Sequence, residues 1–184
     1  MRHIMFDLET LGNGSHAAIV QLAAMEFNIE TGKQSGLRYN LFINYSQDLF
    51  KKFDIDFPTL TWWFKQSKEA QDCVFNSGTE RVELWEALSE FNDLIGMDPY
   101  GQGVRIWSHA TFDPPILDYA YRTVGLTPSF PHKAYMDIRT IKFLSGNLVS
   151  SRTREEFGHQ HDALADCYYQ AAYVSEMYRK VKGL

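Results

Sequence analysis

Residues 4–10 read IMFDLET, an apolar run near the start of the chain that carries two carboxylates. Successive side chains of a β-strand point to opposite faces, so this spacing places Asp7 and Glu9 on one face and Phe6 and Leu8 on the other. Two anions on a half-buried face repel each other unless a partner offsets their charge. The run therefore predicts a divalent-metal site or, if it stands alone, acids that are solvated or paired with Lys or Arg.

The composition is that of a soluble globular protein. The 184 residues are 45% hydrophobic and 22% charged, which fits one domain over residues 1–184. No signal-peptide pattern opens the chain and no apolar run is long enough for a bilayer, so we expect a cytoplasmic protein. The net charge of −5 argues against coating nucleic acid by bulk electrostatics, but it is compatible with a nuclease whose clustered acids hold metal ions. Cys73 and Cys167 lack metal-ligand spacing, and we expect no disulfide.

Alternation of apolar and polar residues predicts strands in the first quarter of the chain and again near its middle. The second and third of these strands flank a turn signal at residues 30–33, which is typical of a hairpin. The predicted strands are residues 2–9, 19–29, 37–45 and 104–108.

Helical spacing predicts five helices, at residues 60–71, 79–95, 116–124, 136–144 and 162–182. Pro58 and Thr59 suit the start of the first helix, Asp113 and Pro114 suit an N-cap and first residue, and Asp162 suits the N-cap of the last helix. The apolar face of residues 79–95 comprises Val82, Trp85, Leu88, Phe91 and Ile95. That of the last helix comprises Leu164, Tyr168, Ala171, Val174, Tyr178 and Val181, with Asp166 off the stripe. This order of elements predicts an α/β fold, a mixed β-sheet flanked by helices on both faces.

Four acids and one histidine stand where these elements can bring them together. Asp7 and Glu9 lie on the first strand, Asp113 follows a strand, and His161 and Asp166 flank the start of the last helix. Functional groups gather at the ends of strands in α/β sheets. We therefore take these five residues as the candidate site.

Three motifs resemble, in order and separation, those of the DEDD exonuclease superfamily: FDLET at residues 6–10, SHATFD at 108–113 and HDALAD at 161–166. The histidine five residues before the last acid matches the DEDDh branch, since the DEDDy branch has Tyr where Asp162 stands. Trp62-Trp63 followed by Gln66-Ser67 is similar to the small phage-type and mycobacterial-type exonucleases. The resemblance covers nearly the whole chain and implies a single ribonuclease H-like domain.

This resemblance implies a 3′-5′ exonuclease that hydrolyses phosphodiester bonds at the 3′ ends of single-stranded RNA or DNA and releases nucleoside 5′-monophosphates. Two Mg²⁺ or Mn²⁺ ions about 4 Å apart would stabilise the attacking and leaving oxygens. Asp7 would bridge both ions, Glu9 and Asp166 would complete the first, and Asp113 would reach the second through water. His161 would be the general base that accepts a proton from the attacking water.

Substrate contacts are also implied by the resemblance. Thr10 and Leu11 would meet the terminal nucleotide, and His109 and Phe112 are candidate stacking surfaces. The resemblance further implies a homodimer. We interpret Trp62 and Trp63 as core or interface packing rather than as base-stacking groups. Two loop arginines, Arg152 and Arg154, could hold phosphates, although a solvated loop explains them better.

Three alternatives remain at this point. A catalytically idle ribonuclease H-like module would bind nucleic acid or protein, but all five catalytic positions are filled. A polymerase proofreading subunit would co-purify with a polymerase. A zinc hydrolase is suggested by the His-x-His pair His159 and His161, but Ala163 and Leu164 stand where the metallo-β-lactamase pattern requires Asp and His.

Overall fold

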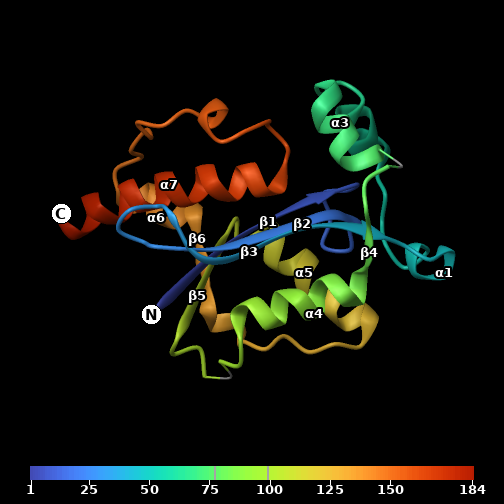
Figure 1. The fold of residues 1–184 in the computed structure, drawn as a ribbon, viewed down its shortest axis with the longest axis horizontal. Coiled ribbons are helices and arrows are strands. Elements are labelled where there is room, and N and C mark those ends of the chain that lie inside the picture. Colours follow the sequence, from blue (N-terminus) through green and yellow to red (C-terminus); the bar gives the residue numbers. More distant parts are fainter. Residues whose placement is uncertain (77, 99) are drawn as a thin grey trace.

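The computed structural model describes residues 1–76, 78–98 and 100–184, and over these residues the chain forms a six-stranded sheet with helices on both faces (Figure 1). This confirms the predicted α/β class. The strands are β1 (Arg2–Thr10), β2 (Ile19–Phe27), β3 (Gln34–Asn44), β4 (Val82–Glu83), β5 (Val104–Ser108) and β6 (Tyr135–Asp137).

The sheet is mixed, with strand order β4-β3-β2-β1-β5-β6. The first three strands pair antiparallel, as the predicted hairpin pattern requires, whereas β4, β5 and β6 are added parallel to their neighbours. In β1 the register places Asp7 opposite Ala23 and Glu9 opposite Gln21, and it shifts between Glu9 and Thr10. The two acids therefore lie where the regular ladder of the central strand ends.

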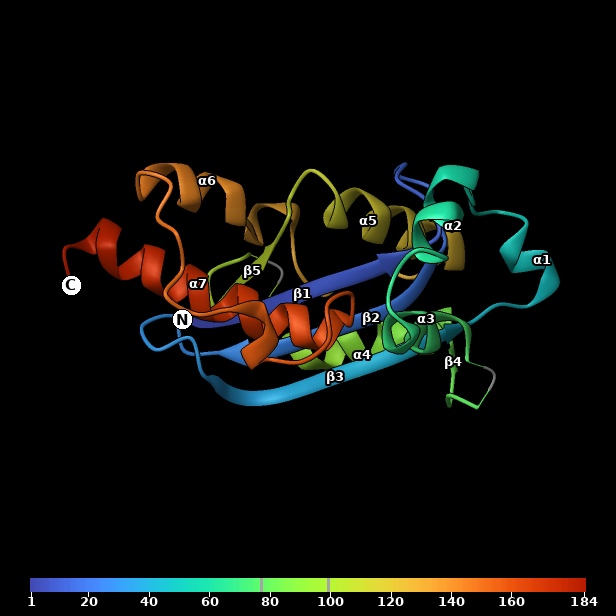
Figure 2. The same cartoon turned by 90° about the horizontal axis from the view of Figure 1, so that it is seen from above.

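Helices cover the sheet in two layers, and Figure 2 shows the same arrangement from above. The structure has, among its described residues, α1 (Gln47–Phe50), α2 (Phe57–Trp63), α3 (Lys68–Phe75), α4 (Leu84–Ile95), α5 (Asp113–Val124), α6 (Ile138–Leu144) and α7 (Ala163–Lys182), with short 3₁₀ turns at His132–Ala134 and Arg154–Glu156.

Alternation along β1 divides the core between the two faces. Phe6 and Leu8 pack into a cluster with residues of α4 and α5 such as Phe91. Met5, on the opposite face, packs with residues of α6 and α7 such as Cys167. Asp7 and Glu9 share the face of Met5, so the two carboxylates point toward the N-terminal end of α7.

Three predicted helices are divided or shortened in the structure. Residues 60–71 are not one helix, because α2 begins earlier, at the Asp56 cap, and Ser67 caps a separate helix α3 by accepting from the Ala70 N–H. Residues 79–95 become β4 followed by α4, since Val82 pairs with Ile43 in the sheet. The predicted 136–144 helix likewise loses its first two residues to β6.

The buried face of α4 differs from the predicted face at Trp85. Trp85 was predicted on the apolar face but is 52% exposed, and the helix instead buries Leu84, Ala87, Leu88, Phe91, Leu94 and Ile95. Leu88, Phe91 and Ile95 are buried as predicted, whereas Trp85 lies outside the buried face.

The start of α7 is as predicted, whereas that of α5 is not. Asp162 caps α7 by accepting from the N–H groups of Leu164 and Ala165. Asp113 is the first residue of α5 and not its N-cap, which is Phe112. Asp166 lies on the buried face of α7 and not off it, because that face meets β1, whereas Val181 is 47% exposed.

Both cysteines are free thiols, as expected. Among the helices that the structure describes, we find none with the length and apolar character needed to cross a membrane. The cytoplasmic location and the homodimer stay predictions.

Candidate active site

Four carboxylates converge at the end of β1. Asp7 and Glu9 come from this strand, Asp113 from the first position of α5 and Asp166 from the first turn of α7. All four are buried, with 1–8% of their surface exposed. Asp113 is the acid that most strongly raises the pKa of Asp7, and Asp166 is the one that most strongly raises that of Glu9. The structure thus brings together the four acids singled out in the sequence.

Burial and mutual repulsion disfavour ionisation of these acids. Burial is the larger cause of the raised pKa values of Asp7 and Glu9, and the neighbouring carboxylates add to it. Burial raises the pKa of Asp113 to about 7 and also raises that of Asp166. Four buried oxygen donors that cannot all be ionised without a cation fit hard divalent ions such as Mg²⁺ or Mn²⁺.

Two hydrogen bonds orient the carboxylates. The buried Gln170 donates from Nε2 to Oδ1 of Asp7 at 2.7 Å. The backbone N–H of His109 donates to Oδ2 of Asp113 at 2.9 Å. Gln170 was missed in the sequence, although it follows Asp166 by four residues and therefore lies on the same face of α7.

His161 completes the group from the residue before the α7 cap. One ligand atom from each of Glu9, His161 and Asp166 lies within 4.8 Å of the others. The backbone of His161 is left-handed, with φ of 65°, and its ring packs edge-on against Trp62 at 4.5 Å between centroids. Burial, helped by the charge of Arg154, lowers the pKa of His161. The imidazole is therefore neutral at neutral pH, the form that can accept a proton.

The paired-histidine zinc alternative does not gain support from this geometry. His159 is exposed, and in the described part of the chain the close group of ligand atoms contains His161 but not His159.

Arg154 lies on the site and not in a solvated loop, which corrects that interpretation. Its guanidinium pairs with the Asp166 carboxylate and also faces the Tyr169 ring. A capping box between Thr153 and Glu156 closes the turn at Arg154–Glu156 that directs Arg154 inward. Sequence periodicity does not reveal how a loop folds back, so this contact was missed.

Arg152 behaves as expected for a loop arginine. Its guanidinium pairs with Glu156, and 48% of its side chain is exposed.

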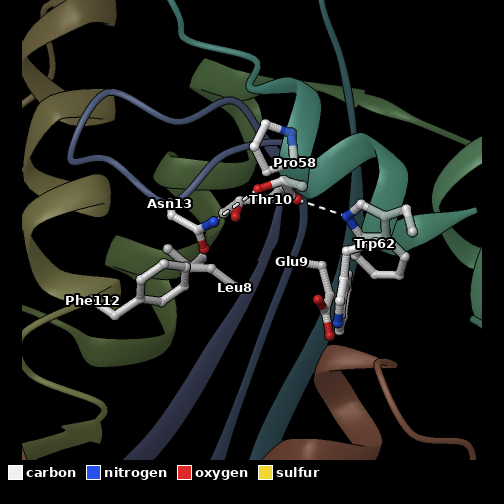
Figure 3. Close-up of a pocket in the computed structure, with 9 residues that line it drawn as sticks. Leu8, Glu9, Thr10, Asn13, Pro58, Trp62 and Phe112 are labelled. Carbon is white, nitrogen blue, oxygen red and sulfur yellow. Dashed lines mark hydrogen bonds between the residues drawn. The ribbon is translucent and has the colours of Figure 1, made fainter. Parts of the chain in front are cut away.

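A cavity of about 430 Å³ opens beside the acids (Figure 3). Phe112 and Leu8 lie on one side of it and Trp62 on the other, with Glu9 next to Trp62 (Figure 3). Its lining residues are Leu8, Glu9, Thr10, Asn13, Pro58, Thr59, Trp62, Trp63 and Phe112.

Of the four predicted substrate contacts, Thr10 and Phe112 line this cavity. Leu11 does not, and its side chain packs in the hydrophobic core instead. His109 does not line it either, although its backbone N–H donates to the Asp113 carboxylate. Alternation along β1 places Leu8, two residues before Thr10, at the cavity instead.

The two tryptophans have different environments. Trp63 is fully buried and donates from Nε1 to the carbonyl oxygen of Thr10 at 2.9 Å, which confirms the packing interpretation for this residue. Trp62 is 41% exposed and lines the cavity. The hydrogen bond of Trp63 ties α2 to the end of β1, so one wall of the cavity is fixed to the strand that carries the acids.

Comparison with known proteins agrees with this geometry. The sequence profile of the Rv2179c-like 3′-5′ exoribonuclease domain matches residues 2–178. An exodeoxyribonuclease of Enterobacteria phage T4 is 31% identical over 132 residues, which cover 64% of this chain and 54% of the phage protein. The chain thus spans about half the length of that relative.

Solved structures show the same fold. E. coli exonuclease I in complex with a dA16 oligonucleotide matches with a TM-score of 0.67 at 15% identity, covering 99% of this chain and 41% of that one. Exonuclease I from Methylocaldum szegediense matches with a TM-score of 0.64 at 15% identity, covering 99% and 41%. Since the family profile spans nearly the entire chain and the acids that resemble its superfamily's motifs meet in one site, this protein belongs to the Rv2179c-like 3′-5′ exoribonuclease domain family.

Proposed function

We propose that this chain is a metal-dependent 3′-5′ exonuclease that removes nucleoside 5′-monophosphates from single-stranded RNA or DNA. The observation that carries the proposal is the meeting of four buried carboxylates and a neutral His161 at the edge of a nucleoside-sized cavity. The described function of the matching family supports the direction of cleavage.

Asp7, Glu9, Asp113 and Asp166 would hold two Mg²⁺ or Mn²⁺ ions, which supply stabilisation of the negative charge that develops on the attacking and leaving oxygens. Oxygen-only carboxylate donors are the ligands that these hard ions prefer. Gln170 fixes the rotamer of Asp7 through its 2.7 Å hydrogen bond, so this carboxylate is oriented before any ion binds.

His161 accepts the proton of the attacking water. It stands beside Glu9 and Asp166, and its ring is held edge-on against Trp62. A general base has to be unprotonated at the start of the reaction, which the lowered pKa of this imidazole provides.

The cavity holds the 3′-terminal nucleoside. Its volume of about 430 Å³ lies within the ordinary range for small-molecule sites, and Phe112 and Trp62 offer aromatic faces to a base of any identity. The Asn13 amide is fixed by donating to the Thr59 hydroxyl at 2.9 Å, so the polar edge of the cavity is rigid. When the terminal nucleoside occupies the cavity, the phosphodiester on its 5′ side lies at the acids.

The sugar preference is open to either ribose or deoxyribose, because the matching family is described by exoribonuclease activity and the phage relative by exodeoxyribonuclease activity. Discrimination requires one or two contacts to the 2′-hydroxyl. Substrates of both kinds therefore belong in the test.

The test is product identity. Single-stranded oligonucleotides of RNA and of DNA would be incubated with Mn²⁺, and the released products separated by liquid chromatography and mass spectrometry. We expect the native protein to release 5′-monophosphates one at a time from the 3′ end. The Glu9→Gln variant should release none. Release from the 5′ end, internal cuts or 3′-monophosphates would contradict the proposal.

A further inference from the structure

The proposed reaction fixes where the remaining strand has to leave the site. In a displacement at phosphorus the attacking and leaving oxygens are in line. In the proposed reaction the attacking water lies next to His161, which groups with Glu9 and Asp166. Asp113 lies outside that group, at the first position of α5, so the proposed reaction puts the leaving oxygen on the side of Asp113 and the turn before α5.

An arginine from a different element is held at this turn. Arg139, in the first turn of α6, donates from Nη1 to the hydroxyl of Thr111 at 2.9 Å. The backbone N–H of Ala110 in the same turn donates to Oδ1 of Asp137 at 3.2 Å. Figure 2 shows α6 beside the connection between β5 and α5. Two contacts thus fix the start of α6 against the turn that carries Asp113.

Arg139 forms no ion pair within the described part of the chain. Arg139 and Lys142 are exposed, lie on one face of α6 and are absent from the ion pairs of that part of the protein. Asp137, the nearest acid in sequence, already accepts three hydrogen bonds, from Ala110 and from Thr140.

Arg139 lies close to the site. Its hydrogen-bond partner Thr111 is two residues before Asp113, in the turn that leads into α5. A cation in the first turn of a helix is disfavoured by the helix dipole. A bound anion would offset this cost, and guanidinium groups match phosphate oxygens in geometry.

We propose that Arg139, braced by Thr111, binds the phosphodiester immediately upstream of the scissile bond. This inference rests on the proposed function and assigns the direction in which the single strand leaves the site. Lys142, one turn further along α6, extends the same basic face beyond Arg139. The ligand is a backbone phosphate, so the contact is independent of base sequence and of the sugar.

The test separates this phosphate from the others. The substrate is a 5′-labelled single-stranded octanucleotide in which the second linkage from the 3′ end is either a phosphate or a neutral methylphosphonate. Removal of the first nucleotide is followed to give kcat and KM. For the native protein we expect the neutral linkage to raise KM roughly tenfold, the usual size of a charge-assisted hydrogen bond.

Arg139→Gln should raise KM for the all-phosphate substrate by a similar factor. In this variant, replacing the phosphate by the neutral linkage should raise KM little further. Such non-additivity is the signature of a direct contact. Arg139→Lys should recover part of the loss, and Arg139→Gln should reduce the slope of log affinity against log salt by about 0.7, the value for one phosphate contact on a single strand.

Arg122→Gln is the matched control, because Arg122 is an exposed arginine in the last turn of α5, at the far end from Asp113. In Arg122→Gln the neutral linkage should raise KM by the same factor as in the native protein. If the neutral linkage raises KM in Arg139→Gln as much as it does in the native protein, the inference is overturned, while the exonuclease activity stays in place. Absence of cleavage by the native protein would instead overturn the proposed function itself.

Discussion

Gln170 and Asp7 are joined by a 2.7 Å hydrogen bond between two side chains that are both buried. The amide comes from α7 and the carboxylate from β1, so the contact fixes the central acid against the helix that carries Asp166. The orientation of Asp7 is therefore set by the fold and not by a ligand.

Gln170→Leu should lower metal affinity by about 10–100-fold, the usual effect of removing a hydrogen-bond partner from a metal ligand. Isothermal titration with Mn²⁺ measures this directly. Gln102→Leu, a change at an exposed loop position, serves as the control. Unchanged affinity in Gln170→Leu would show that Asp7 does not need this partner.

Arg154→Met should raise metal affinity in the absence of nucleic acid. The guanidinium of Arg154 pairs with Asp166 and so competes with a cation for that carboxylate. Arg152→Met, on the same loop but paired with Glu156, should leave the titration curve as in the native protein. Weaker binding in Arg154→Met would mean that the arginine supports the metal site and does not compete with it.

His161→Ala should leave Mn²⁺ binding largely intact and lower the rate of hydrolysis by about 10²–10⁴-fold, the range for loss of a general base. Asp7→Ala should lose both binding and turnover, since it removes the carboxylate at the centre of the site. His159→Ala, at an exposed neighbouring position, should have no effect on either. Equal loss of metal binding in His161→Ala and Asp7→Ala would remove the base role from His161.

Asp113 should contribute stability to the metal-free protein that is lost as the pH rises from about 4 to about 7. Burial raises the pKa of Asp113 from 3.8 to about 7, so the folded state binds this proton more tightly than the unfolded state does. The resulting stabilisation is present at low pH and is lost as the pH rises through the folded pKa. Thermal unfolding in EDTA between about pH 5 and about pH 8 measures the trend.

Asp113→Asn should remove this contribution, because the amide has no proton to lose, so the melting temperatures of the variant and the native protein should depend differently on pH. In the native protein, Mn²⁺ should raise the melting temperature at the upper end of the range. The same pH dependence in both proteins would contradict the raised pKa of Asp113.

The acids of the site could be predicted because each motif fixes a local geometry. Strand alternation alone places Asp7 and Glu9 on one face, and the Asp162 cap fixes the start of α7 and with it the position of Asp166. Both constraints act between residues close in sequence, so they do not depend on how distant elements pack.

The features that were missed depend on tertiary contacts. Strands β4 and β6 have two and three residues, too few to show a period, and exist because a neighbouring strand pairs with them. The inward position of Arg154 depends on how its loop folds back onto α7. The contact between Arg139 and Thr111 likewise joins elements whose relative placement no local pattern encodes.

The central claim is tested most directly by a time course on 5′-labelled single-stranded RNA and DNA of matched sequence, with Mg²⁺, Mn²⁺ or EDTA, for the native protein beside Asp7→Ala. We predict a ladder that shortens from the 3′ end only when the native protein has metal, and the faster substrate identifies the preferred sugar. Intact RNA and DNA in the presence of metals shown to bind would contradict the account and favour a catalytically idle binding module.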